Sequence, residues 1–229
     1  DADTAVYIVS RIAGEGADRF DQPGEYQLSA EEEAHLKMLS ESPCKLVVVL
    51  NAGSPLDTSF LDRYQVDALI QMSQPGMEGG NAFADVLSGK VNPSAKLTDT
   101  WAKQYADYPN ASCFSHNNGN VDKEEYVEGI YVGYRYFDTF GVAPAFPFGY
   151  GLSYTTFALE GKKVIVEDQD GENIRIRVCV NVTNTGKVPG REVVQVYGAC
   201  PQGNLKKEYK RLCGFAKSPM LAPGETQTV

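Results

Sequence analysis

Short apolar runs alternate with helix-like segments over the first hundred residues of the chain. Three runs, at residues 5–10, 45–51 and 67–72, are apolar over nearly their whole length. Continuous runs of this kind are typical of parallel strands that are covered on both faces, whereas strands with one solvated face alternate with a period of two. The pattern therefore predicts a mostly parallel sheet.

Helical segments lie between and after these runs. Ser29 and Glu32 form a capping box, in which the serine hydroxyl accepts from the third helical amide and the glutamate reaches back to the free amide of the serine. Further helices are predicted at about 56–64 and at 78–88, the latter ending at Gly89, a residue suited to a left-handed C-cap. The first hundred residues are thus predicted to form an α/β sandwich, a mostly parallel sheet with flanking helices.

The pattern changes after residue 100. Residues 101–153 are rich in Asn, Gly, Pro and aromatic side chains and show no sustained periodicity, apart from a short strand predicted at 131–136. We interpret them as an ordered connecting arm that packs on the first domain. The aromatic residues clustered at 126–157 are expected either to form a hydrophobic seam between two domains or to offer a stacking platform for sugars.

From residue 154 the chain alternates with the two-residue period of half-buried antiparallel strands. Strands are predicted at 163–167, 174–181 and 193–197, and residues 226–229 are expected to enter another. This pattern predicts an all-β sandwich of the immunoglobulin or fibronectin kind. Such modules run to about 100 residues, so the sandwich, like the α/β domain, is expected to be incomplete in this chain. The predicted domains are 1–100, 101–153 and 154–229.

Composition and charge narrow the function classes. Of the 229 residues, 42% are hydrophobic, which is enough to bury a core and too much for a disordered chain. The net charge of −9 would repel a nucleic-acid backbone, so nucleic acid is not expected as a partner. The chain contains no apolar run of the roughly 18 residues that a membrane span needs, and residues 1–3 do not resemble a signal peptide.

The cysteines and histidines argue against a metal centre. The five cysteines and the two histidines, His35 and His116, are widely spaced and include no CxxC pair, so neither a zinc site nor a cofactor is expected. The odd number of cysteines is a poor disulfide framework, which favours a reducing compartment, such as the bacterial cytoplasm, over secretion. The sequons at Asn110 and Asn181 matter only if the protein is secreted by a eukaryote.

Ligands bind open parallel sheets at the loops that follow the strands. The loop at residues 11–19, after the first predicted strand, places Glu15 between two glycines. A carboxyl in such a loop acts as a general acid or base when its surroundings raise its pKa toward the working pH. The alternative is a solvated turn in which Glu15 and Asp18 pair with Arg11 or Arg19, and the residues by themselves leave both interpretations open.

The loop at residues 74–80 follows the third strand and is also rich in glycine. It lacks the lysine and the glycine spacing of phosphate-binding loops, so packing is the favoured role. Glu78 lies near a helix N-terminus, where a negative charge interacts favourably with the helix dipole, and we interpret it as structural. A Ser/His/Asp or Cys/His site is disfavoured, because His35 lies in a predicted amphipathic helix and leaves His116 as the one remaining base.

Several segments carry a family resemblance. Residues 128–138 (EGIYVGYRYFD) and 146–157 (FPFGYGLSYTTF) closely resemble the C-terminal half of glycoside hydrolase family 3 enzymes, the β-glucosidases and their relatives. Residues 74–89, 91–97 and 221–226 are also similar and occur in the same order. The resemblance implies an α/β sandwich domain followed by a fibronectin type III-like domain, in agreement with the pattern.

The loop that begins at residue 10 is similar to the family segment that carries the general acid/base of retaining hydrolysis. The resemblance implies that Glu15 is this residue, and that Asp18 and Arg19 tune it or contact the sugar. The family's nucleophile is an aspartate on a separate (β/α)8 barrel, and nothing in the chain resembles that barrel. A retaining mechanism needs two carboxyl groups about 5 to 5.5 Å apart, so the second is expected from outside the chain.

The implied substrate is a terminal β-D-glucoside, either a β-linked gluco-oligosaccharide or an aryl or alkyl glucoside, and the implied partner is the barrel of the same enzyme. Residues 96–103 and 117–120 are more similar to a rearranged bacterial subgroup, in which the barrel follows this segment. One family fold hosts several specificities, so a β-xylosidase or an α-arabinofuranosidase stays an alternative. A non-catalytic carbohydrate-binding or scaffold module is another.

Overall fold

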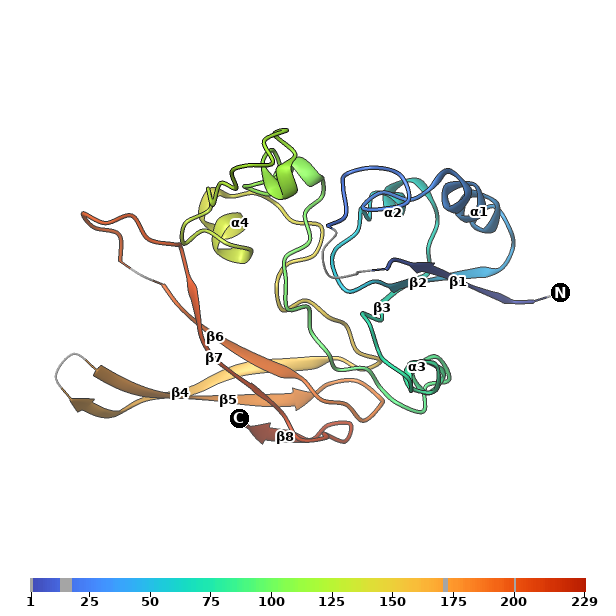
Figure 1. Ribbon diagram of the computed structural model, residues 1–229. Coiled ribbons are helices and arrows are strands. Elements are labelled where there is room, and N and C mark those ends of the chain that lie inside the picture. The colour runs from blue at the N-terminus through green and yellow to red at the C-terminus, as the bar shows by residue number, and fades with distance from the viewer. Residues whose placement is uncertain (1, 13–17, 171–172, 200) are drawn as a thin grey trace. The chain divides into compact units, whose positions relative to one another are not determined.

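The computed structural model describes residues 2–12, 18–170, 173–199 and 201–229 (Figure 1). These residues form two compact units, and each unit is built from segments that are separated along the chain. The first unit comprises Asp1–Ala84, Thr100–Val132 and Gly141–Phe146, and the second comprises Asp85–Asp99, Gly133–Phe140 and Pro147–Val229.

A three-stranded parallel sheet organises the first unit. It contains β1 (Thr4–Ser10), β2 (Lys45–Asn51) and β3 (Ala68–Gln71) in that order, which confirms the three predicted strands. The last residues of β1 and β2, Ser10 and Asn51, are paired, and β3 ends one pair earlier. The carboxyl ends of all three strands therefore lie at one edge of the sheet.

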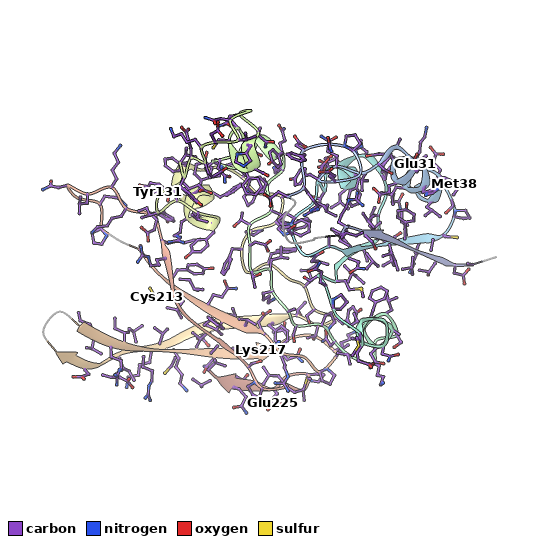
Figure 2. All side chains as sticks on the ribbon, viewed as in Figure 1. Glu31, Met38, Tyr131, Cys213, Lys217 and Glu225 are labelled. Atoms are coloured by element: carbon purple, nitrogen blue, oxygen red, sulfur yellow. The ribbon has the colours of Figure 1, made fainter. Side chains whose placement is uncertain are left out.

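The helix α1 (Ala30–Ser40) begins at the predicted capping box. The Ser29 hydroxyl accepts from the Glu32 amide at 3.2 Å, and the Glu32 carboxylate accepts from the Ser29 amide at 2.8 Å. Leu36 is fully buried where the helix packs on the sheet, whereas Met38 is 61% exposed (Figure 2). The helix therefore packs on the sheet mainly through Leu36 and is only weakly amphipathic, and its start is held by two reciprocal hydrogen bonds.

The helix α2 is shorter than predicted and spans only Phe60–Arg63. The Asp57 carboxylate accepts from the amide and from the hydroxyl of Ser59, both at 2.8 Å. These hydrogen bonds hold the preceding residues in a turn, so the helix starts later than its apolar pattern suggests.

The helix α3 (Gly79–Leu87) agrees closely with the prediction and is followed by Gly89 at a φ of 74°. Two short 3-10 helices, η1 (Tyr105–Asp107) and η2 (Phe114–His116), lie in the segment that lacks periodicity. Within the described ranges, no helix has the length and apolar character needed to cross a membrane.

The prediction of a strand at 131–136 is wrong, because Tyr134–Phe140 form the helix α4. Gly133 precedes the helix at a φ of 57°, a left-handed conformation that interrupts an extended chain. The helical turn brings the ring centroid of Tyr134 within 5.6 Å of that of Tyr197. Packing of aromatic rings therefore outweighs the high β-propensity of these residues.

Two antiparallel sheets make up most of the second unit. One contains β4 (Phe157–Asp170), β5 (Asn173–Asn184) and β8 (Thr226–Thr228), in the order β4-β5-β8. The other pairs β6 (Val193–Gly198) with β7 (Arg211–Lys217), a strand that the sequence pattern does not predict. The predicted all-β character of this part is confirmed; β4, β5 and β6 are longer than their alternating cores suggest, and β8 is one residue shorter than predicted.

A buried asparagine joins the loops around the core of the second unit. Asn184 is fully buried at the end of β5, close in sequence to the core residue Val182. Its side-chain oxygen accepts from the Thr155 hydroxyl at 2.7 Å, and its side-chain amide donates to the carbonyls of Val188 and Leu221, each at 2.9 Å. Its side-chain oxygen also accepts from the Gly186 amide at 3.1 Å, so one side chain satisfies four buried or half-buried polar groups.

Replacing Asn184 with Ala removes the partner of the Thr155 hydroxyl and of the Val188 carbonyl, whereas the Leu221 carbonyl keeps its hydrogen bond from the Gly190 amide at 3.1 Å. An unsatisfied buried polar group costs about 1 to 3 kcal/mol, so Asn184→Ala should lower the local stability of β5 by about 3 kcal/mol. Hydrogen-deuterium exchange of β5 peptides measures the loss. Asn204→Ala, in an exposed loop, is the matched control and should exchange as the wild type does. Equal protection in both variants would contradict the structural role of Asn184.

Candidate active site

An open depression of about 520 Å³ lies at the carboxyl edge of the parallel sheet. The residues that line it end the strands or directly follow them, and they include Arg11, Ile12, Asn51, Met72, Gln74 and Gly76. The parallel register brings these loops together although they are far apart in the sequence, and α/β folds bind ligands at this edge. The edge is therefore the candidate active site.

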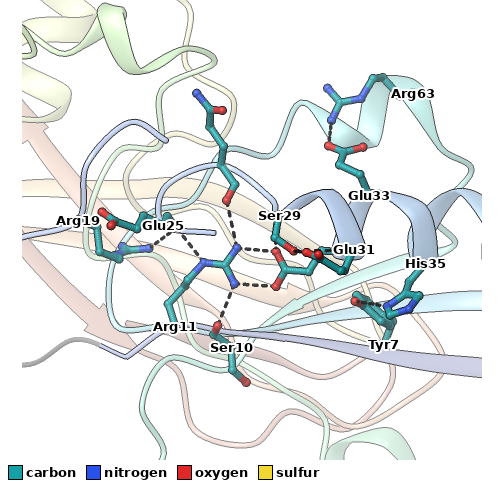
Figure 3. Close-up of polar contacts among 12 residues, drawn as sticks. Tyr7, Ser10, Arg11, Arg19, Glu25, Ser29, Glu31, Glu33, His35 and Arg63 are labelled. Carbon is teal, nitrogen blue, oxygen red and sulfur yellow. Dashed lines mark hydrogen bonds and ion pairs between the residues drawn. The ribbon is translucent and has the colours of Figure 1, made fainter. Parts of the chain in front are cut away.

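Arg11 is the first residue of the loop after β1, and its side chain is held by several hydrogen bonds. Its guanidinium forms two hydrogen bonds of 2.7 Å with the Glu32 carboxylate and also donates to the carbonyls of Ser10, Glu25 and Gln27 (Figure 3). The side chain of Arg11 is 7% exposed. Because Glu32 also caps α1, a single arginine ties the end of β1 to the start of this helix.

The ion pair keeps Glu32 ionised. Burial by itself would raise the pKa of Glu32, but the hydrogen bonds from Arg11 and from the Ser29 amide outweigh burial and lower it. The carboxylate is therefore charged at neutral pH. Removing one member of such a pair leaves the other as an uncompensated buried charge, so the contact is strongly coupled to the local fold.

Arg19 holds the other end of the same loop. Its guanidinium donates to the Ser54 hydroxyl, to the Pro55 carbonyl at 2.9 Å and to the Glu25 carbonyl at 3.5 Å. Burial, and then the neighbouring charge of Arg11, lower the pKa of Arg19 below the usual arginine value. The Arg19 guanidinium therefore binds groups of the protein, which suits a role in positioning the loop.

The predicted acid/base, Glu15, lies outside the described residues. The structure separates the other two predicted site residues, since Arg19 contacts protein groups and Asp18 is exposed at a second cavity, of about 280 Å³. Its further lining includes Asn110, Phe114, His116, Tyr126 and Glu128. The sequence pattern does not predict this cavity, because most of its lining comes from a segment without periodicity. The available signal there is a group of aromatic residues among turn-forming ones.

The glycine-rich loop at residues 74–80 shows the contacts of a packing element. A Cβ at Gly79 would lie 2.4 Å from the ring of Pro75, so glycine is required for their close approach. Glu78 is exposed and accepts from the side-chain amide of Asn81 at 2.7 Å, at the start of α3. Among the residues that the structure describes, no three His, Cys, Asp or Glu side chains are grouped to hold a metal ion.

Comparison with known families identifies the class of protein. The glycosyl hydrolase family 3 C-terminal domain matches residues 1–154, and a fibronectin type III-like domain matches residues 192–229. The chain therefore belongs to glycosyl hydrolase family 3, through the C-terminal domain of that family. The family resemblance and the predicted two-part fold are confirmed.

The individual relatives are β-glucosidases. The chain is 41% identical to β-glucosidase A of Butyrivibrio fibrisolvens and 43% identical to a β-glucosidase of Ruminococcus albus, matching with its whole length 31% and 23% of those proteins. Its structure is similar to that of β-glucosidase 3B from Thermotoga neapolitana in complex with glucose, with a TM-score of 0.90 at 43% identity, covering 99% of this chain and 32% of that one. The chain thus spans less than a third of these relatives.

Glu32→Gln should loosen the start of α1 in a pH-dependent way. At neutral pH the variant leaves Arg11 uncompensated and should lose about 2 kcal/mol of local stability. Because the pKa of Glu32 is lowered in the folded state, its contribution is fully present above the unfolded carboxyl pKa of about 4.3 and is lost as the pH falls through the lower folded value. The difference from the wild type should therefore shrink in acid.

Hydrogen-deuterium exchange of α1 peptides at neutral and acidic pH, corrected for intrinsic rates, measures this difference. Glu41→Gln is the matched control, since Glu41 is exposed at the other end of the same helix. It should behave as the wild type at both pH values. A loss in Glu32→Gln that is independent of pH would show that the side chain acts through packing and not through its charge.

Proposed function

We propose that this chain is part of a retaining β-glucosidase and that Glu15 is the general acid/base of the enzyme. The observation that carries the proposal is the anchoring of the loop, since Arg11 and Arg19 hold the residues on both flanks of Glu15 at the carboxyl edge of the sheet. The motif around Glu15 and the β-glucosidase relatives support the same assignment.

The proposed reaction proceeds in two steps. The protonated Glu15 carboxyl gives its proton to the glycosidic oxygen while the bond from that oxygen to the anomeric carbon breaks, and a carboxylate on the opposite face attacks the same carbon. We assign this nucleophile to an aspartate of a (β/α)8 barrel outside the chain. In the second step the Glu15 carboxylate takes a proton from water, whose oxygen displaces the nucleophile and yields glucose with retained configuration.

The proposed substrate is a terminal β-D-glucoside, and the proposed partner is the barrel of the same enzyme. The similar β-glucosidase 3B was solved in complex with glucose, which favours glucosides over the β-xylosides and α-arabinosides considered from the sequence. Arg19 acts in this proposal as a positioning residue, because its guanidinium already contacts Ser54 and Pro55. Asp18, which is exposed, stays the candidate for a contact with the substrate.

Glu15→Ala in the full-length enzyme should separate substrates by their leaving group. Aryl β-glucosides with poor leaving groups need the proton, so their kcat/KM should fall by about 100-fold or more, whereas activated aryl glucosides should lose much less. With the activated aryl glucosides, which still form the glycosyl-enzyme, azide should raise kcat, because it attacks this intermediate without a base and releases glucosyl azide. Steady-state kinetics and product analysis measure both effects.

Glu78→Gln is the matched control, because Glu78 is a glutamate in a second glycine-rich loop, where it contacts Asn81. This variant should keep wild-type turnover on both kinds of substrate. Near-normal turnover of Glu15→Ala with poor leaving groups would place the acid/base at another residue. The chain would then serve the enzyme as a scaffold or a carbohydrate-binding module.

A further inference from the structure

The second cavity of the first unit has the lining of a site for a neutral ring. Phe114 and Tyr126 supply aromatic faces, and the Tyr126 side chain is 89% exposed although it lines a cavity. Asn110 and Asp18 add an amide and a carboxylate. Such a lining suits sugar or aryl rings, which stack on aromatic faces. Hydroxyl groups on these rings can donate hydrogen bonds to the polar acceptors.

The histidine of this cavity is held in place by its own loop. Its Nδ1 lies 2.9 Å from the Asn120 carbonyl and 3.5 Å from the Glu124 carboxylate. Since a carbonyl can only accept, Nδ1 is the donor in the contact with Asn120. Ser115 and His116 both have left-handed backbones, at φ values of 49° and 62°, a costly conformation for residues other than glycine.

The charges around the cavity disfavour an anionic ligand. Glu124 lies beside His116, and Glu125 is paired with Lys123 at 2.6 Å, while Asp18 and Glu128 add further acidic groups to the wall. A phosphate or a carboxylate would be repelled by this lining. A neutral glycoside leaving group carries no such penalty.

The chain connects this cavity to the proposed reaction. Asp18 is the third residue after Glu15, and three residues of chain span at most about 11 Å. A general acid protonates the oxygen of the leaving group, so the leaving group lies on the side of the acid. We infer that this cavity receives the leaving-group ring of the glycoside, with Tyr126 and Phe114 as its stacking surfaces, an inference that rests on the proposed function.

Two substrates whose leaving groups depart without a proton test this inference in the full-length enzyme. The leaving group of 2,4-dinitrophenyl β-glucoside is a ring, whereas that of β-glucosyl fluoride is a single atom that cannot fill the cavity. Both leaving groups depart as anions, so the acidic lining acts on both, and the contribution of stacking is read from the ratio of variant to wild type on each substrate. Tyr126→Ala should lower kcat/KM about fivefold for the dinitrophenyl glucoside, the size of one lost aromatic contact, and leave the fluoride unchanged. Tyr126→Phe keeps the ring and should restore most of the loss.

Tyr209→Ala is the matched control, because Tyr209 is 60% exposed in the other unit and should affect neither substrate. An equal loss on both substrates in Tyr126→Ala, or no loss on either, would overturn the inference. A variant that merely disturbed Glu15 would spare both substrates, since neither needs its proton. Failure of the acid/base proposal is recognised separately, by normal turnover of Glu15→Ala with poor leaving groups.

Discussion

The contact between Arg11 and Glu32 is the constraint on which the candidate site depends. A planar guanidinium meets a carboxylate through two hydrogen bonds of 2.7 Å and still donates to three backbone carbonyls. A lysine, with a compact charge and no fork, could not make this set of contacts. Because Glu32 also completes the capping box of α1 with Ser29, the loop after β1 starts from a point fixed by both a strand and a helix. With Arg19 engaged at its far flank, the loop is anchored from both sides.

The parallel register of the first unit explains why the chemistry gathers where it does. Strands that run in the same direction end at the same edge, so loops from distant parts of the chain line one depression. The second cavity is built differently, from Asp18 and from residues of the segment that contains η2. In the proposed enzyme the two hollows serve one reaction, since they lie at the two flanks of the loop that carries Glu15.

The second unit shows that a specific sequence signature need not be a chemical one. Within the segments that most resemble the family, Tyr134 and Phe148 lie with ring centroids 5.0 Å apart, and Tyr134 also packs on Tyr197 of β6. The Tyr134 hydroxyl accepts from the Leu212 amide at 2.8 Å, which joins α4 to β7. These residues and the buried Asn184 stabilise the fold of the second unit, whereas the acid/base chemistry is proposed for a loop in the first unit.

The sequence by itself determined the elements that depend on local chemistry. The apolar runs of β1 to β3, the capping box of α1 and the alternation of the second part all follow from period and from neighbours within a few residues. The sequence misled where packing opposed propensity, as in α4, whose aromatic residues read as a strand. Only the tertiary structure decided that Arg11 meets Glu32, 21 residues away, and that Asp18 shares a cavity with Tyr126. Such pairings are set by how whole elements pack, and no periodicity in the chain encodes them.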